Sequence, residues 1–124
     1  MIKITYRKFK KIKKLLTKKF WTFIVTKRCA EAKGVVRANF KTVVTNNTFL
    51  GGNVNFNGMA IMGQGRVDIG DNFHSGTECQ MITSYHNFDG GQAIPYDDTY
   101  IHKDIIIEDN VWLGNRVIVL VISW

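Results

Sequence analysis

Apolar side chains recur at every sixth position through much of the chain. From Ile69 the sequence reads IGDNFH, SGTECQ and MITSYH, and from Ile101 it reads IHKDII, IEDNVW and LGNRVI. Backward from Ile69, the segments LGGNVN, FNGMAI and MGQGRV fit the same period, with one extra residue that we place in a bulge at Arg66–Asp68. An aliphatic first place, with Gly or Asn behind it at a corner of unusual backbone angles, is typical of a hexapeptide β-helix.

In such a structure three short strands make one triangular turn of the chain. The first side chain of each hexapeptide points inward, and the fifth fills the space near the corner. No single turn can bury its apolar face alone, so successive turns must stack. The pattern therefore predicts an all-β fold, a left-handed parallel β-helix of about three turns. Its repeats begin near Leu50, and we assign residues 34–124 to this domain.

The period breaks at residues 87–100, where NFDGGQAIPYDDTY is polar and holds the only proline, Pro95. A loop of this length in so regular a structure is usually functional. His86 stands at the base of the predicted loop, whereas His74 ends a hexapeptide that no loop follows. His86 is therefore the stronger candidate for chemistry, and we expect His102, just after the loop, to be solvated.

A different periodicity precedes the repeats. Large apolar residues recur at steps of three and four, at Phe9, Ile12, Leu15, Leu16, Phe20 and Phe23. This spacing predicts an amphipathic α-helix with lysines on its other face. We therefore expect residues 1–33 to form a basic helical arm ahead of the β-helix domain.

Charge is divided unequally between these two parts. The chain of 124 residues has a formal net charge of +7, but residues 1–33 hold twelve of the seventeen Lys and Arg and a single acid, Glu31. The remainder is mildly acidic. Three readings stay open for the arm: residues 1–28 contact an anionic membrane surface, the helix packs on its own domain or a neighbouring subunit, or it binds nucleic acid. No recognition motif accompanies the charge, so we expect no nucleic acid partner.

The chain length limits the number of domains, and the cysteine content indicates a cellular compartment. A chain of this size is one ordinary domain at most. Cys29 and Cys79 form no CxxC motif, and reduced thiols in a cytosolic protein are the plainest reading. The first twenty residues have no uninterrupted apolar core, so we expect neither a signal peptide nor a membrane span. We expect a cytoplasmic protein, with peripheral contact at the inner membrane face if the arm binds lipid.

The segments VDIGDNFHSGTECQMITSYHNFDGGQAIPYDD and KDIIIEDNVWLGNRVIVL closely resemble the hexapeptide-repeat acyltransferases. The nearest members are sugar and polysaccharide O-acetyltransferases of the galactoside, maltose and xenobiotic types. The resemblance covers residues 48–120 and says little about residues 1–40. It implies a homotrimer that transfers acetyl from acetyl-CoA to a hydroxyl of a sugar or polysaccharide precursor, with no metal.

The resemblance also implies roles for individual residues. His86 matches the family histidine that acts as general base on the acceptor hydroxyl, and histidine suits this role because it changes protonation near neutral pH. Asn55 matches an acceptor-binding asparagine, and Asp89 in the loop would orient the histidine or the acceptor. Trp112 matches a tryptophan on the CoA side, and Asn115 follows at the same edge. A corner role for Asn55 and packing between subunits for Trp112 stay open.

Two other hypotheses stay open. Family members continue after the residues that match NRVIVL, with further turns that supply much of the CoA site, so we expect a C-terminally truncated chain. The second hypothesis is therefore a catalytically impaired remnant that serves as a fold or interaction module. The third is a zinc-dependent carbonic anhydrase on the same β-helix, which would need His74, His86 and His102 to converge on one ion. Their places in the repeat do not favour this.

Overall fold

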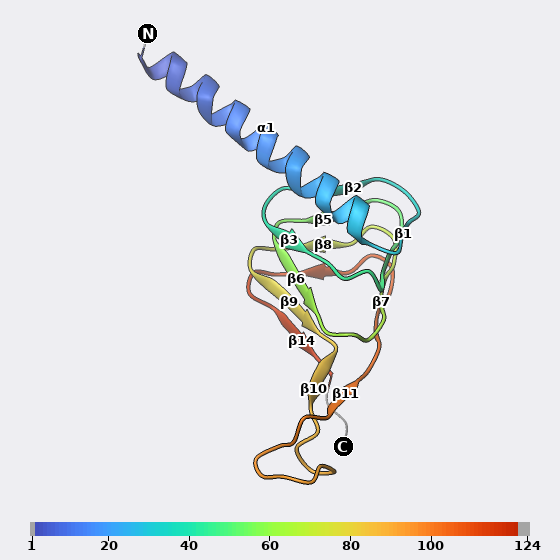
Figure 1. The fold of residues 1–124 in the computed structure, drawn as a ribbon. Coiled ribbons are helices and arrows are strands. Elements are labelled where there is room, and N and C mark those ends of the chain that lie inside the picture. The colour runs from blue at the N-terminus through green and yellow to red at the C-terminus, as the bar shows by residue number, and fades with distance from the viewer. Residues whose placement is uncertain (1, 122–124) are drawn as a thin grey trace.

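The computed structural model describes residues 2–121, in which one long helix leads into a stack of short, mostly parallel strands (Figure 1). The predicted N-terminal helix is present as α1, Ile2–Arg28. The strands are β1 Glu31–Ala32, β2 Val36–Ala38, β3 Thr42–Val43, β4 Thr48–Leu50, β5 Val54–Phe56, β6 Met59–Met62, β7 Val67–Ile69, β8 His74–Ser75, β9 Cys79–Ile82, β10 Ser84–His86, β11 Tyr100–His102, β12 Ile105–Ile107, β13 Trp112–Leu113 and β14 Ile118–Leu120.

The parallel strands form three four-stranded sheets, which we number in chain order. Sheet 1 has the order β1-β4-β7-β12, sheet 2 has β2-β5-β8-β13, and sheet 3 has β3-β6-β9-β14. Successive strands fall in successive sheets, so the chain visits all three sheets in each coil and then pairs with the coil before it. The structure is thus the β-helix-like stack that the six-residue period predicts. In the described residues it has four coils, where about three were predicted.

The coil missing from the prediction is the first one. Its hexapeptides are AKGVVR, ANFKTV and VTNNTF, starting at Ala32 and running without a break into Leu50. Thr42 and Thr48 occupy fifth places in this coil and are fully buried. Small and hydroxyl-bearing residues at the inward positions weaken the hydrophobic pattern of this coil. The pattern therefore predicts that the repeats begin one coil later than they do. Pairing in sheet 1 begins at Glu31, within the range assigned to the basic arm.

The register of the second coil also differs from the prediction. Ile61 is buried and Met62 is 41% exposed, the reverse of the predicted assignment. Paired residues of β5 and β8 are 19 positions apart in the sequence, whereas paired residues of β6 and β9 are 20 apart. The corner between β5 and β6 is therefore one residue shorter than the corner between β8 and β9. Gly58 at this corner has φ of 114°, which glycine tolerates. The extra residue of this coil lies in the connection that follows Ile61. The predicted bulge at Arg66–Asp68 is wrong, since β7 pairs regularly with β4 and β12.

Backbone angles with positive φ occur at the fourth position of the hexapeptides. The sequence pattern predicts them at the second position, directly after the first. Asn53, Asn72 and Asn110 have φ of 55°, 59° and 62°, and asparagine tolerates this region better than most residues. Their side chains form a ladder between coils, with Nδ2···Oδ1 distances of 2.9 Å from Asn53 to Asn72 and 2.9 Å from Asn72 to Asn110. Glycine in the second place serves close approach instead. A Cβ on Gly76 would lie 2.7 Å from the backbone nitrogen of Asn115.

The interior of the coils is a column of apolar side chains. Phe56 and Phe73 are fully buried, and their rings meet edge to face with centroids 5.7 Å apart. The other buried apolar residues are Val25, Val36, Ala38, Val44, Leu50, Val54, Met59, Ile61, Val67, Ile69, Cys79, Met81 and Ile105. Since they come from every coil, hydrophobic burial couples each coil to the next.

Helix α1 covers the first coil with its C-terminal end only. Val25 is fully buried in the core, and Trp21 packs against it. The Thr22 hydroxyl accepts a hydrogen bond from the Ala38 N–H at 3.0 Å, and Arg28 Nε donates to the Val44 carbonyl at 2.7 Å. The N-terminal part of α1 projects away from the coils (Figure 1). One of the three hypotheses for this helix is that it packs on its own domain. The last turns of α1 do so.

An arm lies between the third coil and the fourth, at the other end of the stack from α1 (Figure 1). Strands β10 and β11 pair antiparallel and enclose residues 87–99, most of the predicted loop. Tyr85 and Ile101, which the repeat places inside the coils, pair with each other in this arm. Paired positions are 38 residues apart between β7 and β12 but 19 apart between β4 and β7. The chain therefore enters the fourth coil in register with the third.

Candidate functional site

The arm positions His86 as the last residue of β10, opposite Tyr100 of β11. One more backbone hydrogen bond, from the Asn87 N–H to the Thr99 carbonyl at 3.0 Å, extends the pairing beyond the strands. His86 therefore lies where the regular backbone of the arm gives way to its loop. This is the base of the loop, the place that the sequence predicts for it.

Two tyrosine rings enclose the His86 imidazole. The Tyr96 ring is stacked on it, with centroids 3.7 Å apart and an interplanar angle of 18°, and the Tyr100 ring is tilted against it at 4.6 Å. His86 itself is half-buried. The rings restrict the orientation of the imidazole, which a group that transfers protons requires.

One nitrogen of this imidazole is free. Nδ1 of His86 is buried and has no hydrogen-bond partner, and it is the only such side-chain atom found among the described residues. Leaving a buried polar atom unpaired costs stability, so such an atom in a folded protein calls for an explanation. A group that exchanges a proton with a bound hydroxyl would supply one.

The loop of the arm is held by Asp97. Its carboxylate accepts hydrogen bonds from the Thr99 hydroxyl and from the Gln92 and Thr99 N–H groups, the latter two at 2.8 Å each. These bonds, led by the one from the Thr99 hydroxyl, hold the pKa of Asp97 below its usual value. Because Tyr96 directly precedes Asp97, this anchored turn also sets where the Tyr96 ring meets His86.

Among the described residues, no hydrogen bond or ion pair joins a predicted acceptor residue to His86. Asn55 lies in β5 of sheet 2, paired with His74 of the next coil. Its side chain is 3.5 Å from Arg37 Nη1, whose hydrogen bond it accepts. Asp89 is exposed in the loop of the arm and has no hydrogen bond or ion pair among the described residues. Within one chain, hydrogen bonds therefore tie neither group to the imidazole.

The predicted donor-side residues occupy the last coil. Trp112 in β13 is 76% exposed, and its ring meets the His74 ring edge to face at 6.4 Å. Asn115 Oδ1 accepts a hydrogen bond from the Thr77 N–H at 2.9 Å, so this side chain already has a role at a corner. Trp112 thus offers a large open aromatic surface, whereas Asn115 joins two coils.

Two contacts of the arm were not foreseen from the sequence. The six-residue repeat does not point to Tyr96, although an aromatic residue in an otherwise polar loop beside a candidate histidine is a usable signal. His102 was expected to be solvated, and it is exposed, but its Nδ1 shares a hydrogen bond with the Ser84 hydroxyl. The His102 ring also stacks with Tyr100 at 6.4 Å. A row of rings thus runs from Tyr96 through His86 and Tyr100 to His102.

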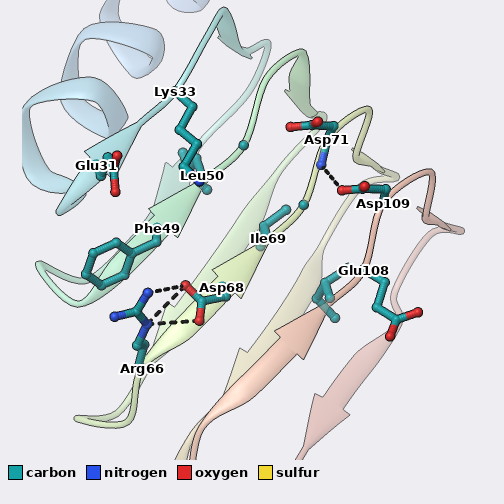
Figure 2. Close-up of a pocket in the computed structure, with 13 residues that line it drawn as sticks. Glu31, Lys33, Phe49, Leu50, Arg66, Asp68, Ile69, Asp71, Glu108 and Asp109 are labelled. Atoms are coloured by element: carbon teal, nitrogen blue, oxygen red, sulfur yellow. Dashed lines mark hydrogen bonds and ion pairs between the residues drawn. The ribbon is translucent and has the colours of Figure 1, made fainter.

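A separate groove of about 670 Å³ runs along sheet 1 (Figure 2). In it, Arg66 lies over the Phe49 ring at 3.7 Å and forms an ion pair with Asp68 at 2.9 Å, and this hydrogen-bonded pairing raises the pKa of Arg66. Asp109 Oδ1 accepts the Asp71 N–H at 2.7 Å. These charged groups are engaged with one another or with the backbone, and the free imidazole nitrogen lies elsewhere, on the arm.

Within the described part of the chain, no three His, Cys, Asp or Glu side chains are grouped so that they could hold a metal ion. Among the described residues, no helix combines the length and apolar character needed to cross a bilayer.

Comparison of the chain with protein-family models, with curated proteins and with solved structures finds no match.

Proposed function

We propose that this protein is an acetyl-CoA-dependent O-acetyltransferase of the hexapeptide-repeat kind, acting on a hydroxyl of a sugar or polysaccharide precursor. The observation that carries the proposal is His86: a half-buried imidazole at the base of an arm, enclosed by Tyr96 and Tyr100, with an unpaired buried Nδ1. An imidazole with an unpaired buried nitrogen, at the base of a protruding arm, is a candidate for a catalytic base.

In the proposed reaction, the acceptor hydroxyl attacks the carbonyl carbon of the thioester while His86 takes the hydroxyl proton. The new C–O bond forms, the C–S bond breaks, and the imidazolium returns its proton to the departing CoA sulfur. The products are the acetyl ester and free CoA, so atoms and charge balance without a metal. Backbone N–H groups would stabilise the negative oxygen of the tetrahedral intermediate.

The remaining site residues belong to the same proposal. Asn55 and Asp89 would bind the acceptor, and Trp112 and Asn115 would border CoA. Since neither Asn55 nor Asp89 is hydrogen-bonded to His86 among the described residues, we propose that a homotrimer completes the site between neighbouring subunits. The open ring of Trp112, 76% exposed, suits either a CoA surface or a subunit contact.

Left-handed winding of the coils is also part of the proposal, since the resemblance to the acyltransferase family implies it. The six-residue spacing of inward side chains and the three parallel sheets support it. We further propose that the protein works in the cytoplasm, where acetyl-CoA would be available to it.

The test is release of free thiol from acetyl-CoA in the presence of a panel of sugar acceptors. We expect His86→Ala to lower the acceptor-dependent rate by roughly 10²- to 10⁴-fold, the usual contribution of a general base. His102→Gln is the matched control, because this exposed histidine lies on the same arm and is not assigned to the reaction. Its rate should stay close to that of the wild type.

Equal acceptor-dependent rates in the wild-type protein and in His86→Ala would contradict the proposal. The reading of the chain as a catalytically impaired fold or interaction module would then be favoured. Thermal unfolding of both variants, measured in parallel, separates a lost base from a lost fold.

A further inference from the structure

Helix α1 carries an apolar stripe that nothing in the described chain covers. The stripe consists of Phe9, Ile12, Leu16, Phe20 and Phe23, and each of these side chains is between 55% and 63% exposed. Steps of three and four residues place them on one side of the helix. Contiguous large apolar side chains in water are unfavourable, and such patches usually mark a contact surface.

The apolar stripe faces away from the coils. Val25, which is fully buried against the first coil, follows Phe23 by two residues. At 3.6 residues per turn this separation is about 200° of rotation, so Val25 and the stripe lie on opposite sides of α1. The end of the helix can therefore stay packed on the coils while the stripe meets a partner. The projecting N-terminal part lengthens the available surface (Figure 1).

The charge of α1 indicates what that partner is. The helix contains eleven Lys and Arg and no Asp or Glu. Among the described residues none of these cations forms an ion pair, since both salt bridges of the described chain lie in the coils. Lys13 and Lys19 flank the apolar stripe, and the Lys27 ammonium lies 5.7 Å from the centroid of the Phe23 ring. The partner must accept apolar side chains and many positive charges together.

We propose that α1 attaches the protein to the surface of an anionic lipid bilayer. The apolar stripe enters the boundary between headgroups and acyl chains, while the flanking lysines meet acidic headgroups. A second copy of this chain fits less well, because it would bring two sets of uncompensated lysines together. Nucleic acid would accept the charge but would leave the phenylalanines in water.

The test is co-sedimentation of the full chain with vesicles of phosphatidylcholine alone and of phosphatidylcholine mixed with phosphatidylglycerol. We expect binding to the anionic vesicles, weak binding to the neutral ones, and release from the anionic vesicles as salt is raised. Phe9→Ala/Leu16→Ala/Phe20→Ala should weaken binding by at least roughly tenfold. Lys8→Gln/Lys13→Gln/Lys19→Gln should weaken it by roughly fivefold for each lysine removed.

The matched control is Ile106→Thr/Ile118→Thr, which removes exposed apolar side chains from the coils instead of the helix. It should bind like the wild type. Alanine favours helix, so a loss of binding in the triple-alanine variant reflects the stripe rather than unfolding of α1. Circular dichroism of each variant checks this.

Three results would overturn the proposal. The first is equal binding to neutral and anionic vesicles. The second is anionic binding that survives the triple-alanine change, which would show adsorption by charge without insertion. The third is an absence of vesicle binding together with self-association that the triple-alanine change abolishes, which would assign the stripe to a second copy of the chain.

Discussion

Asp97 shows how much of the arm depends on one side chain. Its carboxylate closes the turn by accepting three hydrogen bonds from Gln92 and Thr99, and Tyr96 beside it carries the ring that stacks on His86. Asp97 is only partly buried, so its effect is local rather than a large part of global stability. The conformation of the arm should therefore respond to the protonation of this residue.

Acidification should release the turn at a pH below that at which an ordinary aspartate titrates. The hydrogen bonds lower the folded pKa of Asp97, so their contribution is present above the pKa of the unfolded chain and is lost as pH falls through the folded value. The amide resonances of Gln92 and Thr99 should report this in an acid titration followed by NMR. In Asp97→Ala the transition should be absent, and a midpoint at or above about 3.9 in the wild type would contradict the expectation.

At the scale of single elements, corner residues decide where strands begin and end. Fourth-place asparagines supply left-handed backbone, and Gly63 supplies it in the longer connection between β6 and β7, where φ is 102°. A Cβ on Gly63 would lie 2.8 Å from the backbone nitrogen of Ser84, the first residue of the arm. This connection therefore fixes the place at which the third coil opens into the arm.

Gly63→Ala should lower the free energy of unfolding by roughly 1–3 kcal/mol, because a strained φ and a close contact with backbone act together. Gly114→Ala is the control, since a Cβ there meets nothing within 4 Å. Its effect should stay within roughly 0.5 kcal/mol. Urea denaturation of the two variants and the wild type gives the comparison, and similar losses in both variants would contradict it.

At the scale of the whole molecule, stability is a property of neighbouring coils. Each coil contacts the coil before it and the coil after it. At the first coil, the C-terminal end of α1 packs where a preceding coil would otherwise lie. Val25 is the side chain by which the helix joins this column of apolar residues. The helix therefore has two separable parts, an end that belongs to the fold and a projecting part that carries most of the apolar stripe.

Val25→Ala should lower the free energy of unfolding by about 2 kcal/mol, through lost burial and the cavity left behind. Val35→Ala is matched to it, because Val35 is the same residue type but 57% exposed. That change should cost less than about 0.5 kcal/mol. If both variants unfold at the same urea concentration, α1 is not coupled to the coils as the structure indicates.

Prediction from the sequence worked where inward positions hold large aliphatic side chains, as at Ile69 and Ile105. It failed at Ala38 and Thr42, whose buried side chains give little hydrophobic signal. It also failed at Met62, because a pattern of residue types cannot reveal that one corner is a residue shorter than the others. The period is set by inward packing, whereas the register depends on backbone angles at individual corners.

The candidate site was partly foreseeable for a related reason. The position of His86 at the base of the loop follows from the period alone, as the last residue before the repeat breaks. Its contact with Tyr96 depends on how the loop folds back, which hydrogen bonds to Asp97 decide. No periodicity constrains such a turn, so the contact appears only in three dimensions.

The arm departs from the third coil and leads into the fourth in register, with β12 pairing on β7 as β7 pairs on β4. Changes in the length or sequence of the arm therefore need not disturb the strands on either side. In evolutionary terms, the frame and the arm can diverge independently. A lineage built on this stack of coils could exchange one arm for another while the coils continued to be selected for folding.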